Sequence, residues 1–420
     1  MKKENKTSDN FFVRIFRKFS QFCFLSIKNA NENMIWESAS ACAFGFIFSF
    51  IPVVLIILTV LVTILKLSPE ILSYVIDFAN QFKSFYDFTP LINALLKMKS
   101  ISFIEIFLAV WVIWMARKLF YSVVSGINRI FRSVSKRLSV VNQMFSIVSE
   151  FVVVLIFILV IIFSFLFNKL NQLSFFKFLN KSFPILFSAG SNRLIISITY
   201  FLFFIFSVYS YKILSGAKPR WRTCIFYAAI STGVTFVISF FINKFMRITN
   251  YNIVYGAIST LVILLFKVYL FFAVFMFCAQ MLYVSEFFEN LLICELYYAQ
   301  TVKKNQVNIL FYEKMFKNPV FSDFFITKRF TNQQKIYSQN DEAKFVFYLK
   351  KGIILDVQEN HCNTYRTGDF FGESSIILSE NRKSKAIAVG ECEVSYIPKK
   401  NFQKILADYP KLGKIALQKI

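Results

Sequence analysis

Histidine and clustered metal ligands are what this chain of 420 residues lacks most clearly. It has one histidine, His361, and its seven cysteines are scattered without a CxxC pair. Metal sites need several His, Cys or carboxylate ligands at short spacings, and no HxH motif or carboxylate cluster occurs. The sequence therefore argues against a metal-dependent nuclease, a zinc site and a disulfide framework, and we expect no catalytic residues, no metal and no enzymatic activity.

Acidic residues are also few, with 24 Asp and Glu against 48 Lys and Arg, which gives a formal charge of +24. A strongly basic balance is one mark of nucleic-acid-binding proteins. The basic residues lie largely between long apolar runs, however, where the positive-inside rule places many of them in membrane proteins. We therefore expect no nucleic-acid partner.

Long apolar runs dominate what is present. Hydrophobic residues make up 56% of the chain, above the share found in globular domains. A helix of about 20 residues crosses the ~30 Å hydrocarbon core of a bilayer. Six runs are long enough, at residues 39–65, 101–124, 144–167, 194–214, 222–243 and 256–284. The pattern predicts an α-helical polytopic, multi-pass membrane protein with about six transmembrane helices and membrane lipids as partners.

The distribution of Lys and Arg orients these helices. We count 17 on the side of the N-terminus and 10 on the opposite side, which places the N-terminus and, after six spans, the C-terminus in the cytoplasm. Residues 1–34 precede the first span and carry Phe12, Phe16 and Phe19 at helical spacing beside basic residues. They predict an amphipathic cytoplasmic helix that lies on the membrane surface or packs on protein.

The composition changes near residue 285, where polar and charged residues become frequent. Residues 286–324 are expected to form a helical linker. Alternating stretches then occur at residues 344–350, 353–357 and 392–397, with glycines between them. Period-2 patterning of this kind predicts a small antiparallel β domain over residues 325–420.

One string in this second region has legible ligand chemistry: residues 368–384, GDFFGESSIILSENRKS. Amides at the start of a short helix and a nearby guanidinium suit a phosphate. The string resembles the phosphate-binding cassette of the cyclic nucleotide-binding domain family, whose fold is a β-roll. The resemblance extends over about residues 325–415 and includes residues 345–352 as a strand followed by a turn.

The resemblance implies a role for each residue of the cassette and a regulatory ligand, cAMP or cGMP, without any other cofactor. Arg382 would hold the cyclic phosphate, Glu373 the ribose 2′-hydroxyl, and the amides from Gly372 to Ser374 would complete the pocket. Lys383 and Ser384 follow where the family usually has small residues. The alternative is a degenerate module that regulates by contact or promotes oligomerisation.

The membrane region, residues 35–285, resembles the YihY/BrkB family of bacterial inner-membrane proteins, formerly named after a ribonuclease. The matching strings are SACAFG at residues 40–45 with FSFIP at 48–52, SGINRIF at 125–131, PRWR at 219–222 and NIVYG at 252–256. The resemblance implies a location in the cell inner membrane and a role in envelope integrity or in the transport of lipid or another amphiphile.

Two positions in the sixth span depart from that family. Lys267 stands where the family usually has an aromatic residue, and Gln280 replaces an acidic one. A lysine inside a span costs on the order of 2.5–3.5 kcal/mol on insertion scales unless it finds a partner or a water-filled cavity. Glu105 and Glu150 are candidate partners, so these four residues could line a translocation path. The alternative is a structural polar contact or a snorkelling side chain.

Three functions remain to be compared. The first is a non-enzymatic envelope protein or transporter whose membrane part is regulated by the C-terminal domain. The alternative is a cyclic-nucleotide-gated channel, although the sequence has neither a selectivity-filter-like loop nor an arginine-rich voltage sensor. The least favoured is a ribonuclease. The sequence does not specify the transported substrate or the oligomeric state.

Overall fold

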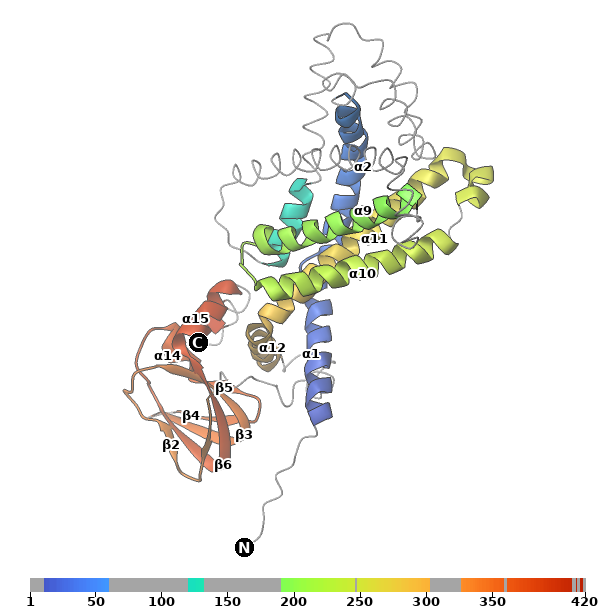
Figure 1. Cartoon of the computed structure of the whole chain (residues 1–420). Coiled ribbons are helices and arrows are strands. Elements are labelled where there is room, and N and C mark those ends of the chain that lie inside the picture. The colour runs from blue at the N-terminus through green and yellow to red at the C-terminus, as the bar shows by residue number, and fades with distance from the viewer. Residues whose placement is uncertain are drawn as a thin grey trace, which may run out of the picture. The chain divides into compact units, whose positions relative to one another are not determined.

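The computed structural model describes residues 11–59, 120–131, 190–245, 248–302, 326–358 and 361–409, together with residues 413, 416 and 417. The chain forms two compact units. One comprises Asn29–Tyr283, and the other combines Met1–Lys28 with Val284–Ile420. Figure 1 labels their helices and strands.

Apolar helices build the described part of the unit Asn29–Tyr283. They are α2 (Ile35–Thr59), α9 (Gly190–Tyr209) with the π-helix η2 (Ser210–Leu214), α10 (Trp221–Phe245) and α11 (Ile248–Glu286). Within them, Trp221–Ile242 and Val262–Glu286 are long and apolar enough to cross a membrane, and Ile35–Phe48 and Thr199–Leu214 are shorter apolar helices. These stretches coincide with four of the six predicted spans. The run at residues 144–167 and most of the run at 101–124 lie outside the described residues.

Phenylalanine and tyrosine supply much of the packing between these helices. The ring of Phe275 on α11 is fully buried and lies 5.1 Å from Tyr211 and 5.8 Å from Phe206, measured between centroids. The Tyr211 hydroxyl donates a hydrogen bond of 2.8 Å to the carbonyl of Phe275. Aromatic pairs of this kind add to the stabilisation from area burial alone, so α11 is anchored at its centre to the end of α9.

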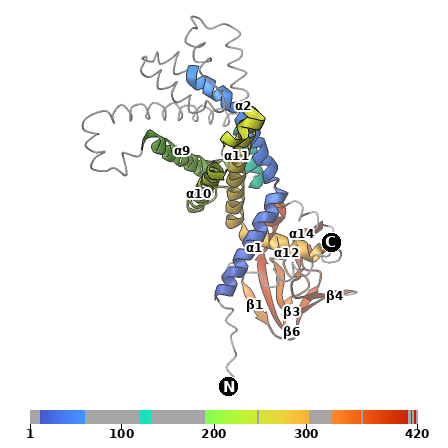
Figure 2. The ribbon, with the colours of Figure 1, turned by 90° about the vertical axis from the view of Figure 1, so that its right-hand side faces the viewer.

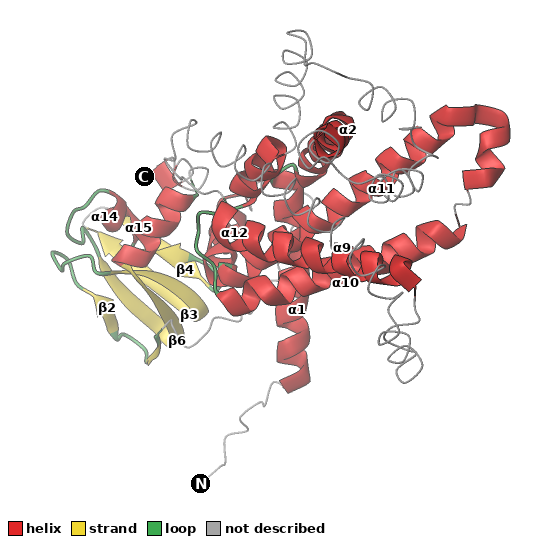
Figure 3. Ribbon diagram, turned by 45° about the horizontal axis from the view of Figure 1, so that its top comes forward, coloured by secondary structure: helices red, strands yellow, loops and turns green. Residues whose placement is uncertain are grey.

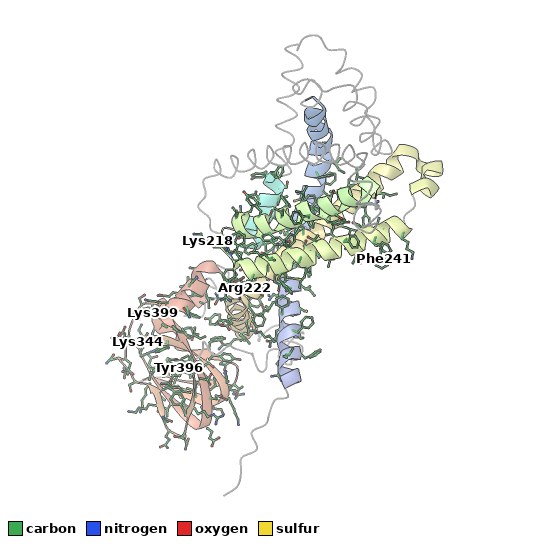
Figure 4. All side chains as sticks on the ribbon, in the orientation of Figure 1. Lys218, Arg222, Phe241, Lys344, Tyr396 and Lys399 are labelled. Atoms are coloured by element: carbon green, nitrogen blue, oxygen red, sulfur yellow. The ribbon has the colours of Figure 1, made fainter. Side chains whose placement is uncertain are left out.

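The outward faces of the same helices stay apolar. On α10, Phe236, Phe240 and Phe241 are exposed in this unit, as lipid-facing side chains of a membrane helix would be. Arg222 lies at the start of α10, Lys244 lies in its last turn, and Figure 4 shows Arg222 at one end and Phe241 near the other. The cytoplasmic position of the helix start stays a prediction.

In the described part of the second unit, α1 and α12 lie outside the β domain. Residues up to Lys28 of α1 (Phe11–Glu32) contact α12 (Phe288–Val302). A single residue, Phe287, separates α12 from the end of α11. The Nζ atom of Lys28 lies 2.5 and 2.6 Å from the two carboxylate oxygens of Glu295. Phe16 and Phe19 of α1 remain exposed, so the predicted apolar stripe of this helix is available to a further surface.

The C-terminal residues fold into an antiparallel sheet, shown in yellow in Figure 3. Its strands are β1 (Thr327–Phe330), β2 (Lys335–Tyr337), β3 (Phe345–Gln358), β4 (His361–Arg366), β5 (Phe370–Phe371) and β6 (Lys385–Pro398). The order is β1-β6-β3-β4, with β2 paired to β6 and β5 to β3. Helix α14 (Glu373–Ile377) follows β5, and α15 (Lys399–Asp408) follows β6. The predicted antiparallel β domain is confirmed.

The core of this domain follows the period-2 pattern of its two long strands. Leu349 and Ile354 of β3 and Val394 of β6 are fully buried, and they pack with Phe347 and Phe371. Alternation places one face of each strand inward. The long strands β3 and β6 therefore form the frame that positions the short β5 and the cassette after it.

The expected turn at the end of residues 345–352 is wrong. Strand β3 runs through this segment, and its pairing with β6 shifts register between Leu349 and Ile353. A bulge replaces the turn because Gly352 adopts φ of +105° and lies against β6. A Cβ atom on Gly352 would be 2.5 Å from Cys392 Sγ and 2.8 Å from the Glu391 carbonyl oxygen. Only glycine fits this position without strain.

Gly352→Ala should therefore destabilise the C-terminal domain by about 3 kcal/mol or more, since left-handed strain and overpacking both contribute. Urea-dependent proteolysis of the full chain with a C-terminal tag measures this. Gly368→Ala is the matched control, because Gly368 has φ of +98° but no heavy atom within 4 Å of an added Cβ. It should cost only about 1–2 kcal/mol of strain; equal losses for the two variants would contradict the packing argument.

Candidate functional site

The predicted cassette forms a strand, a tight turn and a short helix. Strand β5 ends at Phe371, Gly372 caps the helix with φ of 73°, and α14 begins at Glu373. A left-handed residue is needed to redirect the chain into α14, and glycine adopts that conformation readily. Gly372, Glu373 and Arg382 are brought together here, as the spacing predicts.

Arg382 lies inside the domain, with 3% of its surface exposed. Its Nη1 donates to the carbonyl of Gly372 and its Nη2 to the carbonyl of Phe345. A Cβ atom added to Gly372 would lie 2.7 Å from Nη1, so the glycine also permits this close approach. The guanidinium therefore ties the cassette to the first residue of β3.

Aromatic rings surround this guanidinium. Its central carbon lies 4.6 Å from the ring centroid of Tyr337 and 5.4 Å from that of Phe347. Phe347 stacks on Phe371 at 5.1 Å, and Phe371 stacks on Tyr365 at 5.4 Å. Cation–π attraction strengthens when the cation is desolvated. Side chains of the domain itself thus fill the space around Arg382.

Two buried carboxylates complete the electrostatics. Burial lowers the pKa of Arg382, and the nearby carboxylates of Asp356, Glu373 and Asp341 raise it. Asp356 and Glu373 are 9% and 4% exposed. A buried guanidinium needs compensating negative charge, and these carboxylates supply it.

Asp356 and Tyr337 belong to the site although no sequence motif predicts them. Asp356 is two residues after the fully buried Ile354 of β3, so both face inward. The sequence signal that could have identified Asp356 is a charged residue at a core-facing position of an alternating strand. Burial raises the pKa of Tyr337, which also shares a hydrogen bond with Ser384.

The other predicted cassette residues lie outside this cluster. Ser374 is exposed, and Lys383 is exposed with its Nζ 2.6 Å from Glu380. Ser384 is half-buried beside Tyr337. The cassette thus divides into a buried group around Arg382 and an exposed rim.

The contacts of Arg382 limit how a cyclic phosphate could approach it. Two of its five N–H donors are used on the carbonyls of Gly372 and Phe345, and the stacked rings of Tyr337 and Phe347 lie beside the guanidinium. The negative charge of the phosphate would also lie near Asp356 and Glu373, which already offset the guanidinium. The phosphate role of Arg382 stays a prediction.

Helix α12 contacts the cassette directly (Figure 2). The side-chain oxygen of Gln300 accepts a hydrogen bond of 3.1 Å from the Phe370 N–H, and its amide donates one of 3.4 Å to the Phe370 carbonyl. The buried ring of Tyr297 lies 5.5 Å from Phe370 and 6.1 Å from Phe402 of α15. Burial raises the pKa of Tyr297, and the charge of Glu373 adds to the effect. The helix that follows α11 is therefore attached to the strand that opens the cassette.

Of the residues predicted to line a translocation path, Lys267 and Gln280 lie in different places. Lys267 lines a cavity of about 270 Å³ in the unit Asn29–Tyr283. Gln280 instead accepts a hydrogen bond of 2.8 Å from the buried amide of Asn33. It lies thirteen residues along α11 from Lys267, about 20 Å at 1.5 Å per residue. Glu105 and Glu150 lie outside the described residues.

Arg382→Ala should destabilise the C-terminal domain by about 3–5 kcal/mol, since two carbonyls lose donors and two buried carboxylates lose their counter-charge. Urea-dependent proteolysis of the full, tagged chain measures this. Lys383→Ala is the control on the exposed rim and should change stability by less than about 0.5 kcal/mol. An Arg382→Ala domain as stable as the wild type would show that the guanidinium is not a structural tie.

Comparison with known proteins agrees with the division of the chain. The model of the Virulence factor BrkB family matches residues 26–288, and that of the Cyclic nucleotide-binding domain matches residues 327–409. No curated protein matched the chain.

Solved structures similar to the C-terminal part include one described as Sp-2Cl-cAMPS bound to PKAR CBD2, at 22% identity over 30% of this chain and 86% of that one, with a TM-score of 0.21. The Catabolite Activator Protein of Thermus thermophilus is 18% identical over 22% and 47%, with a TM-score of 0.21. The regulatory domain of Toxoplasma gondii PKA with cAMP is 19% identical over 32% and 52%, with a TM-score of 0.23.

The chain spans about half the length of these last two proteins. The three scores are too low to support an argument, so the fold assignment depends on the strand order and the family match. The model of the membrane family covers well over half of the sequence. The chain therefore belongs to the Virulence factor BrkB family, and a cyclic nucleotide-binding domain follows its membrane region.

Proposed function

We propose that this protein resides in the inner membrane, with both termini in the cytoplasm, and moves or organises lipid or another amphiphile in support of envelope integrity. Family membership and the apolar helices α10 and α11 support this proposal. The C-terminal domain regulates the membrane region.

The contact between α12 and the cassette carries the regulatory part of the proposal. Only Phe287 separates α12 from α11 in the sequence, so a change at the cassette that moves α12 would act on the last membrane helix. Gln300 bonds to both the N–H and the carbonyl of Phe370, and the ring of Tyr297 packs against the ring of the same residue. Coupling of this kind requires an element with two arrangements that both sites influence. In our proposal this element is α12, which is either attached to the cassette or released from it.

Regulation by contact fits the buried group better than regulation by a cyclic nucleotide. Arg382 already donates to two carbonyls, and Tyr337, Phe347 and Phe371 fill the adjoining space. Binding of cAMP or cGMP to Arg382 would have to use the other donors of the guanidinium or displace these contacts. The domain therefore acts through its own surface, and any ligand works by loosening the attachment of α12.

The test is lipid movement in proteoliposomes, followed with a fluorescent phospholipid and dithionite quenching. Chains ending after residue 302 and full-length Gln300→Leu should change the rate in the same direction, by about fivefold or more, the lower end of typical coupling between sites. Gln403→Leu on the exposed face of α15 is the matched control and should behave as wild type.

Two outcomes would contradict the proposal in different ways. If truncation changes the rate but Gln300→Leu does not, the domain regulates by another route. If no variant moves lipid faster than protein-free vesicles, the transport role is wrong. Nucleotide-dependent conductance without lipid movement would favour a gated channel instead.

A further inference from the structure

We propose that the cavity around Lys267 binds the anionic head group, phosphate or carboxylate, of an amphiphile. This inference rests on the proposed function and names the substrate class for it. The cavity has a volume of about 270 Å³ and lies among α2, α10 and α11. That is enough for a head group and too small for a whole lipid, so the acyl chains would lie outside it.

Three polar side chains stand out in the described lining, which is otherwise apolar. They are Lys267 from α11 and Thr235 and Ser239 from α10. Thr235 and Ser239 are four residues apart, so they share one face of the helix. One cation and two hydroxyls directed into an apolar cavity form the donor set that an anionic head group needs.

Thr235 gives an independent sign of a ligand. Its side chain is 6% exposed, and its Oγ1 has no hydrogen-bond partner among the described residues. Hydroxyls in apolar helices usually bond to the carbonyl four residues earlier, as Thr232 does to Ala228 at 2.9 Å. Buried polar groups are almost always paired, and a head-group oxygen would satisfy this one.

The surface beside the cavity suits the acyl chains. Val262 and Phe266, five residues and one residue before Lys267 on α11, are exposed, as are Phe240 and Phe241, one and two residues after Ser239 on α10. An amphiphile bound with its head group on Lys267 would lay its chains on these side chains. The combination of a partly buried cation and exposed apolar side chains favours an amphiphile over a free anion.

The position of the cavity along α10 indicates on which side of the membrane the head group would lie. Thr235 and Ser239 lie in the half of α10 that is farther from Arg222, which Figure 4 labels near the start of the helix. With the start of α10 in the cytoplasm, as we propose, the cavity belongs to the outer half of the membrane. The head group would therefore be held on the external side of the bilayer.

The experiment is equilibrium binding of a fluorescent short-chain phosphatidylglycerol to the detergent-purified full chain, measured by fluorescence anisotropy. Lys267→Met should weaken binding at least tenfold, Lys267→Arg should restore most of it, and Thr235→Val should weaken it about threefold. Lys244→Met, at the exposed end of α10, is the charge-matched control and should leave binding unchanged. Unlabelled phosphatidylglycerol should compete, whereas phosphatidylcholine and inorganic phosphate should not.

Several results would overturn the inference. Equal affinity of Lys267→Met and wild type would do so, as would equal losses for Lys267→Met and Lys244→Met. Competition by inorganic phosphate at concentrations comparable to the lipid would show a free-anion site instead. A wild-type protein that moves lipid while Lys267→Met binds normally would refute this site and leave the proposed function standing. Charge-selective binding that depends on Lys267 without lipid movement would do the reverse.

Discussion

The burial of one guanidinium organises the C-terminal domain. Arg382 bonds to the carbonyls of Gly372 and Phe345, and thereby joins the cassette to the strand that pairs with β4, β5 and β6. Removing a cation from water is costly unless acceptors and counter-charges surround it. Tyr337, Phe347, Asp356 and Glu373 provide that surrounding. Because β5 precedes Gly372 directly, the same tie fixes the backbone that Phe370 presents to Gln300.

Arg382 and Lys267 have different surroundings. Arg382 is buried, donates to backbone carbonyls and packs against the rings of Tyr337 and Phe347. Lys267 borders an open volume that also contains the buried Thr235 hydroxyl. The first arrangement suits a structural tie and the second suits a binding site. In our proposal, the domain with the recognisable ligand motif acts through its contact with α12, and the apolar membrane region supplies the candidate binding site.

Much of the fold could be predicted from local patterns. Alternation over residues 344–350, 353–357 and 392–397 predicted strands, and the structure confirms them within β3 and β6, because one face of each must be buried. The glycine and glutamate of the cassette predicted the start of α14. The turn expected near Gly352 was wrong, because a bulge also uses a glycine with positive φ and spacing alone does not separate the two.

The partners of the site residues could not be predicted in this way. The spacing from Glu373 to Arg382 is the same whether the guanidinium holds a phosphate or a carbonyl. Its actual acceptor on Phe345 lies 37 residues away in the chain. Lys267 and Gln280 stand out equally as departures from an apolar helix, yet 13 residues on one helix place them at different depths. Only the tertiary structure gives one a cavity and the other Asn33.

Native mass spectrometry of the full chain, purified in mild detergent, tests the central claim most directly. The account predicts adducts with the mass of an anionic lipid, lost in Lys267→Met and kept in Lys244→Met, and no adduct with the mass of cAMP or cGMP when either is added. A spectrum with a stoichiometric cyclic nucleotide, or with no selective lipid, would contradict the account.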